Sequence, residues 1–310
     1  MTAAAQRLEQ LTVIPVPGPG AEDVLVSDGF VYTGTEDGSV FKIQRDGRRA
    51  EPVGNTGGRP LGLEALPDGR ILVCDAQRGL LALDPSSGDV EELTRLVNGQ
   101  PMRFCNNAAV ASTGEIYFTD SSRHYPIEQW KADLVENTRS GRLLRRNTDG
   151  SVDVLLDGLA FANGVALAAD ESYVAVAETG GRTVVRLWLT GARAGERDLL
   201  AEDLPGYPDN IARGSDGLVW VTIASPKDPV LERLMRAPML VRRAAWKLPE
   251  ALQPKPRRTA RVMALDDEGR IVHDRSLDAS DFHMVTGVRE HEGRVWLGSL
   301  VQPAIAVFDV

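Results

Sequence analysis

The sequence predicts an all-β fold: a single six-bladed β-propeller with four-stranded antiparallel blades, spanning residues 1–310 as one domain. Three observations support this prediction. A strand-and-turn unit recurs six times, its average spacing is about fifty residues, and both ends of the chain carry strand-like runs. Short strands joined by tight turns at even spacing are typical of barrels, sandwiches and propellers, and about fifty residues is the length of a four-stranded blade.

Each unit starts with a tight turn, which contains glycine in every unit except the fourth, where Glu171 begins it. The six β-rich runs that follow the turns are residues 29–34, 69–75, 114–120, 171–177, 217–222 and 293–298. A second β-rich run follows in each unit, at residues 39–43, 79–83, 142–145, 184–188, 261–265 and 304–308. Asp-Gly dipeptides beginning at positions 28, 37, 46, 68, 149 and 216 separate these runs, as hairpin turns require.

The ends of the chain predict that the repeats close into a ring. Residues 304–310 form a full strand, and residues 11–14 read as another strand near the N-terminus. Pairing between them would remove two exposed sheet edges. A solenoid, the alternative arrangement of repeats, would need capping ends instead.

Two insertions interrupt the repeat, at residues 124–139 in the third unit and at residues 226–258. In the second insertion, apolar residues recur at helical spacing within 230–235 and 240–246, which predicts helices. These helices are expected either to form a lid over one face of the propeller or simply to pack on its surface.

The composition narrows the classes of function. A net charge of −9 and a pI near 5.1 disfavour nucleic-acid binding, because an acidic chain repels phosphate backbones. The two cysteines, Cys74 and Cys105, lie in or beside apolar runs and are expected to be buried thiols. The N-terminus has no signal-peptide core and no apolar run approaches the length of a membrane span, so we expect a cytoplasmic protein without a membrane partner. The oligomeric state stays open.

Aligning the six units on their first turn identifies one equivalent position in each unit. Counting back seven or eight residues from each turn reaches the start of the preceding strand, which lines the central channel of a propeller. The six residues are Glu22, Leu61, Asn106, Asn163, Asp209 and Val285. Four of them carry side-chain oxygens, and burying such groups without partners would be costly unless a metal ion were bound.

The chemistry of this set predicts a hard cation. Two carboxylates with several amides, and no thiolate or imidazole, suit Ca²⁺ first, with Mg²⁺, Mn²⁺ and Zn²⁺ as alternatives. Asn107 and Asn210 adjoin the set and are candidates for further oxygens. The alternative interpretation is that the asparagines are ordinary turn residues entering strands and that Glu22 is solvated.

Segments along nearly the whole chain resemble the strictosidine-synthase-like propellers of the wider gluconolactonase (senescence marker protein) and paraoxonase superfamily of calcium-binding six-bladed propellers. They are residues 21–24, 31–35, 58–63, 116–122, 140–144, 161–165, 177–179, 204–211 and 297–300. The resemblance implies a catalytic calcium site at Glu22, Asn106, Asn163 and Asp209. Asn210 matches a further ligand of the paraoxonase branch.

One departure from the family bears on the reaction. Plant strictosidine synthases resemble this chain near residues 288–293, and a catalytic Glu stands a few residues upstream in them, where this chain has Thr286. A neutral hydroxyl cannot act as that base, so Pictet–Spengler condensation is disfavoured.

We therefore expect a metal-dependent hydrolase that acts on a small-molecule lactone or ester, as a gluconolactonase or arylesterase would. Asp209 is a candidate base for activating water, because a metal-bound carboxylate keeps a free oxygen. His124, at the end of a strand, and His283, before the sixth inner strand, are further candidates, although each can instead be an ordinary surface histidine.

Two other classes of function stay open from the sequence. One is a ligand-binding or scaffold propeller whose metal is structural, which would show a closed coordination shell in place of one open to a pocket. The other is a strictosidine-synthase-like biosynthetic enzyme of different chemistry, which the genomic neighbourhood would distinguish.

Overall fold

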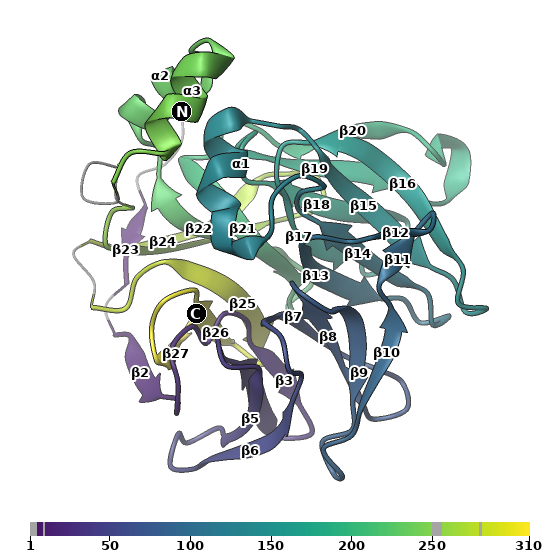
Figure 1. Ribbon diagram of the computed structural model, residues 1–310. Helices are drawn as coiled ribbons and strands as arrows, with labels where there is room; N and C mark the ends of the chain where they lie inside the picture. Colours follow the sequence, from purple (N-terminus) through teal and green to yellow (C-terminus); the bar gives the residue numbers. More distant parts are fainter. Residues whose placement is uncertain (1–4, 9, 250–255, 279–280) are drawn as a thin grey trace.

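Six sheets surround a common axis in the computed structural model, which describes residues 5–8, 10–249, 256–278 and 281–310 (Figure 1). Each sheet contains four sequential or ring-closing strands in antiparallel order, and the fifth sheet has one further short strand at its outer edge. The first strand of each blade lies nearest the axis, against the first strands of the neighbouring blades. The prediction of a six-bladed propeller with four-stranded blades is confirmed.

The blades follow one another along the chain, with strands running from the axis outward. The first two blades are β3 (Leu25–Ser27), β4 (Phe30–Gly34), β5 (Ser39–Gln44) and β6 (Ala50–Asn55), then β7 (Pro60–Ala65), β8 (Ile71–Asp75), β9 (Gly79–Leu83) and β10 (Val90–Thr94). The next two are β13 (Cys105–Val110), β14 (Ile116–Asp120), β15 (Gly141–Arg146) and β16 (Val152–Leu159), then β17 (Ala162–Leu167), β18 (Tyr173–Glu178), β19 (Thr183–Trp188) and β20 (Arg197–Ala201). The last two contain β21 (Gly206–Arg213), β22 (Val219–Pro226), β23 (Thr259–Leu265) and β24 (Ile271–Asp278), then β25 (Val285–His291), β26 (Arg294–Ser299), β27 (Ala304–Asp309) and β2 (Thr12–Pro15).

The two ends of the chain close the ring within the sixth blade. Strand β2 pairs antiparallel with β27, and Thr12 lies opposite Val307 and Pro15 opposite Ala304. The predicted pairing of the N-terminal and C-terminal strands is thus confirmed. The sequence analysis did not foresee that β1 (Gln6–Arg7) joins β24 in parallel, or that β11 (Leu96–Val97) and β12 (Gln100–Pro101) form a small separate hairpin.

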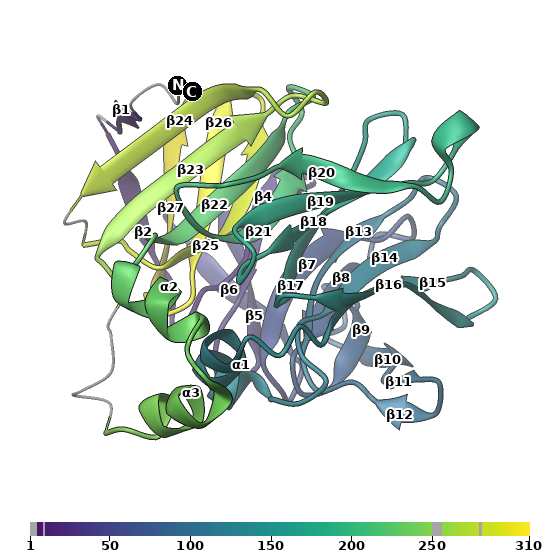
Figure 2. The same cartoon turned by 90° about the horizontal axis from the view of Figure 1, so that it is seen from above.

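Both insertions contain helices. The first holds a 3₁₀ turn, η1 (Ile127–Gln129), followed by α1 (Trp130–Glu136), and the second holds α2 (Pro229–Met235) and α3 (Met239–Trp246). Asp228 caps α2 by accepting hydrogen bonds from the first amides of the helix, and Pro229 fills its first position, a pattern that favours helix initiation. The three helices contact one another and lie side by side in both ribbon views (Figure 2). The remaining short 3₁₀ turn is η2 (Gly191–Arg193).

Apolar side chains between the blades form the core. Trp220 and Trp296 on the second strands of two blades are almost fully buried, as are Val31 and Leu72. Cys74 and Cys105 are buried free thiols in one of these clusters, as predicted. No helix among the described residues is long and apolar enough to cross a lipid bilayer.

Candidate metal centre and cavity

A β-bulge near the start of the inner strands fixes the axial side chains. The pairing of inner and second strands shifts register between Pro60 and Leu63, between Cys105 and Ala108, and at the equivalent places in the fourth, fifth and sixth blades. Two residues of each inner strand therefore lie in the bulge, and a bulge re-aims the side chains that it contains. In the first blade the matching pair, Glu22 and Asp23, lies just before β3 and is separated from it by Val24.

The first residue of each pair lines a common cavity on the axis. These six residues are Glu22, Leu61, Asn106, Asn163, Asp209 and Thr286. Five of them are those found by counting turns. In the sixth blade the count reached Val285, which is instead buried in the core, because the bulge begins one residue later and brings Thr286 to the cavity.

The second residue of each pair alternates between a polar side chain and glycine around the ring. Asp23, Asn107 and Asn210 occupy the odd blades, and Gly62, Gly164 and Gly287 the even ones. A Cβ atom on Gly164 would lie 2.1 Å from the backbone nitrogen of Ile211, so only glycine fits there. This alternation is visible in the sequence, although the sequence analysis did not use it.

Two of these polar side chains join neighbouring blades. Asp23 accepts a hydrogen bond from the backbone amide of Leu63 at 3.0 Å, and Asn107 accepts one from Val165 at 2.9 Å. The side-chain oxygen of Asn107 thus accepts a hydrogen bond from the protein, and the ligand role considered for Asn107 stays a prediction. Asn210 behaves differently, since its amide nitrogen donates to the Glu22 carboxylate at 3.2 Å.

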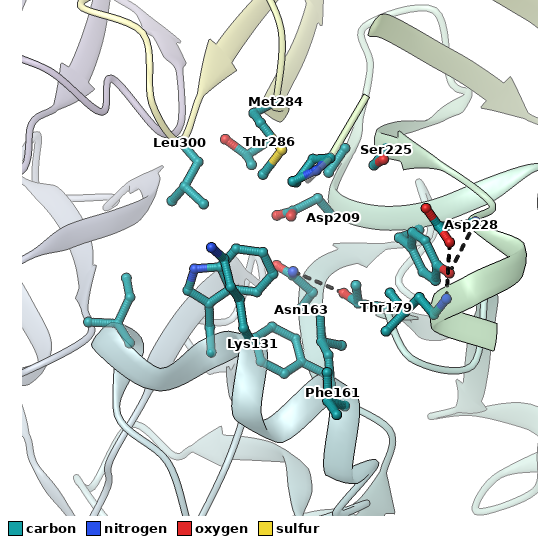
Figure 3. Close-up of a pocket in the computed structure, with 18 of the residues that line it drawn as sticks. Lys131, Phe161, Asn163, Thr179, Asp209, Ser225, Asp228, Met284, Thr286 and Leu300 are labelled. Carbon is teal, nitrogen blue, oxygen red and sulfur yellow. Dashed lines mark hydrogen bonds between the residues drawn. The ribbon is translucent and has the colours of Figure 1, made fainter. Parts of the chain in front are cut away.

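Three buried amide oxygens at the ring accept no hydrogen bond from the protein: Oδ1 of Asn106, of Asn163 and of Asn210. The amide nitrogens of the first two donate hydrogen bonds to hydroxyl groups. Asn106 donates to Ser121 at 2.9 Å and Asn163 to Thr179 at 3.1 Å, a contact drawn in Figure 3. Buried acceptors without donors are rare in folded proteins, and a cation is a natural partner for them.

The two carboxylates of the ring repel each other in a buried setting. Burial raises the pKa of Glu22 well above its ordinary value, and the nearby charges of Asp23 and Asp209 raise it further. Burial likewise raises the pKa of Asp209 to about 7, against a lowering hydrogen bond from Asn163. A positive charge between them would oppose both shifts. Two carboxylates and three orphaned amide oxygens are therefore a donor set that fits Ca²⁺ or another hard divalent cation.

The ring forms the floor of a cavity of about 360 Å³, within the range of small-molecule sites. Its walls come from the inner strands and from all three helices of the insertions. Figure 3 shows Asp209 and Thr286 on one side of this space, with Lys131 and Phe161 on the other. Asp209 is partly exposed to the cavity, whereas Glu22, Asn106 and Asn163 are almost fully buried beneath it.

No histidine is among the described residues that line this cavity. His283 lines an adjoining hollow, where its Nδ1 lies 3.0 Å from the side-chain nitrogen of Gln302; Met284 and Leu300 border both spaces. His124 is exposed at the start of the first insertion, beside Ser122 and Asp133. The roles considered for both histidines stay predictions.

Thr286 has a structural contact that the sequence could not show. Its hydroxyl donates a hydrogen bond of 2.8 Å to the backbone oxygen of Glu22, and its own backbone oxygen accepts one of 2.7 Å from Thr222. Thr286 thus ties the backbone of Glu22 in the first blade to the sixth blade.

Comparisons with known proteins show which family the chain resembles. The family model for strictosidine synthase matches residues 106–192, and the model for the strictosidine synthase-like N-terminal segment matches residues 3–43. The strictosidine synthase-like 10 protein of Arabidopsis thaliana is 32% identical over 314 residues, which cover 90% of this chain and 82% of the relative. The adipocyte plasma membrane-associated protein of Homo sapiens is 35% identical over 312 residues, covering 92% and 74%.

Solved structures share the fold at much lower identity. A gluconolactonase from Xanthomonas campestris superposes with a TM-score of 0.71 at 15% identity, covering 96% of this chain and 89% of that one. Regucalcin from Agrobacterium tumefaciens, described as a calcium-binding protein, superposes with a TM-score of 0.66 at 12% identity, covering 96% and 93%. At these identities the likeness establishes the fold alone.

Proposed function

Since the chain belongs to the strictosidine synthase-like family, we propose that it is a hydrolase of a small ester or lactone that depends on a divalent cation, most simply Ca²⁺. The observation that carries the proposal is the convergence of three orphaned amide oxygens and two carboxylates on the floor of one cavity. The names of the gluconolactonase and regucalcin neighbours support it by analogy of fold.

Glu22, Asn106, Asn163, Asp209 and Asn210 would hold the cation. When bound, a divalent cation polarises a carbonyl oxygen and stabilises the negative charge that develops on it during hydrolysis. The hydroxyls of Ser121 and Thr179 keep the amide oxygens of Asn106 and Asn163 free, and Thr286 holds the backbone of Glu22. These contacts preorganise the floor before the substrate arrives.

Asp209 is the residue that we assign to proton transfer. Its carboxylate is the one partly exposed to the cavity, so it can accept a proton from a water molecule beside the substrate. The apolar walls limit access of bulk water to this position, which strengthens the electrostatic interactions on the floor. Pictet–Spengler condensation remains disfavoured, because the hydroxyl of Thr286 is committed to the backbone of Glu22.

The proposal is tested with a panel of lactones, carboxylic esters and phosphotriesters. The protein is first treated with EDTA and then assayed with Ca²⁺, Mg²⁺, Mn²⁺ or Zn²⁺ in turn. We expect turnover that is lost with EDTA and restored by Ca²⁺. If no substrate turned over with any of the four cations while the protein still bound one of them, a scaffold with a structural metal would be the better account.

A further inference from the structure

Above the ring of axial side chains the cavity is lined mostly by apolar side chains. They come from structures far apart in the sequence and converge under the three helices: Trp130 and Leu134 of α1, Phe161 beside β17, Leu231 and Leu234 of α2, and Trp246 of α3. Figure 3 shows Asp209 on one side of this space and Phe161 in the wall across from it.

Most polar residues of these walls are already engaged within the protein, and Lys131, which also lines the cavity, holds its ammonium group 5.7 Å from the centre of the Trp130 ring. The hydroxyl of Thr179 donates to the backbone oxygen of Pro208 at 2.8 Å, and the carboxylate of Asp228 accepts from the first amides of α2. Tyr207 donates to Glu232 at 3.2 Å. A ligand rich in hydroxyl groups would leave its hydrogen bonds to water without finding equivalent partners here, which costs free energy.

An acidic residue of α1 helps to hold Trp246 in the wall. Its indole nitrogen donates to the Glu136 carboxylate at 3.0 Å, while Arg243 approaches the other oxygen of that carboxylate at 3.5 Å. Arg242 donates to the backbone oxygen of Glu136 at 2.8 Å, and the ring of Tyr125 packs edge-on against the indole. Glu136 is buried, so these contacts fix the position of α3 over the cavity.

We propose that the space between α1, α2 and α3 binds an apolar group of the substrate, such as an alkyl chain or an aromatic ring, and that Trp246 determines this specificity. Glu136 acts as a positioning residue through its hydrogen bond to the indole. The inference rests on the proposed function only in assigning this group to an ester or lactone; the apolar site itself requires no hydrolysis.

Binding of 2-alkanones tests the inference directly, because they carry a carbonyl group and an alkyl chain but cannot be hydrolysed. Calorimetric titration of EDTA-treated protein with ketones of six to twelve carbons should show affinity rising about fourfold per methylene until the space is filled. Glucono-δ-lactone, which is rich in hydroxyl groups, should not compete.

Variants of the wall separate specificity from folding. Trp246→Ala should weaken binding of the longer ketones by at least about tenfold, as expected for loss of a large apolar contact. Glu136→Gln keeps an acceptor for the indole and should bind nearly as the parent does, whereas Glu136→Leu should weaken binding. Leu240→Ala is the matched control, because Leu240 lies on α3 but its side chain is 81% exposed. Thermal melting checks that each variant is folded.

The outcomes distinguish this inference from the proposed function. Affinity that did not depend on chain length, or folded Trp246→Ala that bound ketones like the parent, would overturn the apolar site even if esters were hydrolysed. Chain-length dependence that Trp246→Ala removes would support the site even if no ester turned over.

Discussion

At the scale of single residues, the orientation of three amide groups defines the site. A carboxamide has a donor end and an acceptor end, and the neighbouring hydroxyl groups occupy the donor ends of Asn106 and Asn163. The acceptor ends are left without donors, next to two carboxylates whose pKa values burial raises. Amides supply oxygen ligands without adding further negative charge, which limits the repulsion in the metal-free protein.

Replacing Asp209 with Asn separates proton transfer from metal binding. The amide keeps an oxygen of similar size but cannot accept a proton, so turnover should fall by roughly 10²–10⁴ while the cation still binds. Asp228→Asn is the matched control, since Asp228 also lines the cavity but caps α2, a role that Asn can perform. Wild-type turnover in folded, metal-bound Asp209→Asn would exclude Asp209 as the base.

The carboxylates also predict how the stability of the metal-free protein depends on pH. Because the pKa of Asp209 is raised from about 3.9 to about 7, the folded state binds more protons than the unfolded state in this interval. The contribution of Asp209 is therefore fully present below pH 4 and is lost as the pH rises through 7, and Glu22 acts in the same direction. In EDTA, we expect Tm to fall between pH 5 and pH 8.

Calcium provides the control for this measurement. Cation binding favours the charged carboxylates, so the fall in Tm between pH 5 and pH 8 should become smaller when Ca²⁺ is added. In EDTA, the fall in Tm should also be smaller for Asp209→Asn than for the parent protein. A Tm that rose from pH 5 to pH 8 in EDTA, or one that Ca²⁺ left unchanged at pH 8, would be inconsistent with this account.

Much of the site could be predicted at the residue scale, because each residue that points to the axis lies seven or eight positions before the first turn of its unit in the sequence. Glu22, Asn106, Asn163 and Asp209 all reach the cavity. The count failed at Val285 because the register of a bulge depends on pairing with the neighbouring strand, which the sequence pattern does not specify. The hydrogen bond of Thr286 to Glu22 joins residues 264 positions apart, and no local pattern reports it.

At the scale of elements, the bulges let the inner strands pack closely around the axis. Polar residues and glycines alternate at the second bulge position, so that each glycine accommodates the backbone of its neighbour. Gly62, Gly164 and Gly287 all lie where a Cβ atom would approach backbone atoms of another blade within 2.7 Å. The close approach of the blades thus depends on these three residues.

Gly164→Ala tests this dependence. The added methyl group would meet the backbone of β21 next to Asp209, so we expect a loss of stability of about 1–3 kcal/mol or more, typical of overpacking. Gly180→Ala is the control, because its φ is likewise compatible with alanine and its nearest contact would be a much milder 3.1 Å to a backbone oxygen, which a shift of a few tenths of an ångström would relieve. Urea unfolding compares the two, and equal midpoints would show that the blades tolerate the methyl group.

The elements themselves were only partly predictable. Local periodicity in the sequence predicts the strands of the six blades and the two helices of the second insertion. The structure contains these strands, and the helices are α2 and α3. The parallel pairing of β1 with β24 brings together residues at opposite ends of the sequence. Two residues are too short a strand to carry a sequence signal of their own.

At the scale of the whole molecule, β2 closes the ring, because this N-terminal strand supplies the fourth strand of the sixth blade. The strand places Ile14 in the core beside Trp296 and Ile305, while Val13 on the same strand is half exposed. Closure therefore contributes buried apolar contacts as well as backbone hydrogen bonds.

Two neighbouring substitutions test the contribution of closure. Ile14→Ala removes buried contacts and should lower the free energy of unfolding by about 2–5 kcal/mol, whereas Val13→Ala should change it by less than about 0.5 kcal/mol. Chemical unfolding monitored by tryptophan fluorescence measures both. Equal effects would mean that β2 is not closed tightly onto β27 in solution.

The ring of six blades matters for function because it brings ligands from distant parts of the chain to one point. The most direct test is a crystal structure of the protein grown with Ca²⁺. The account predicts one ion on the axis, with oxygens of Glu22, Asn106, Asn163 and Asp209 at roughly 2.3–2.6 Å and at least one position open to the cavity. An axis without an ion at saturating Ca²⁺, with the Oδ1 atoms of Asn106 and Asn163 pointing away from the axis, would contradict it.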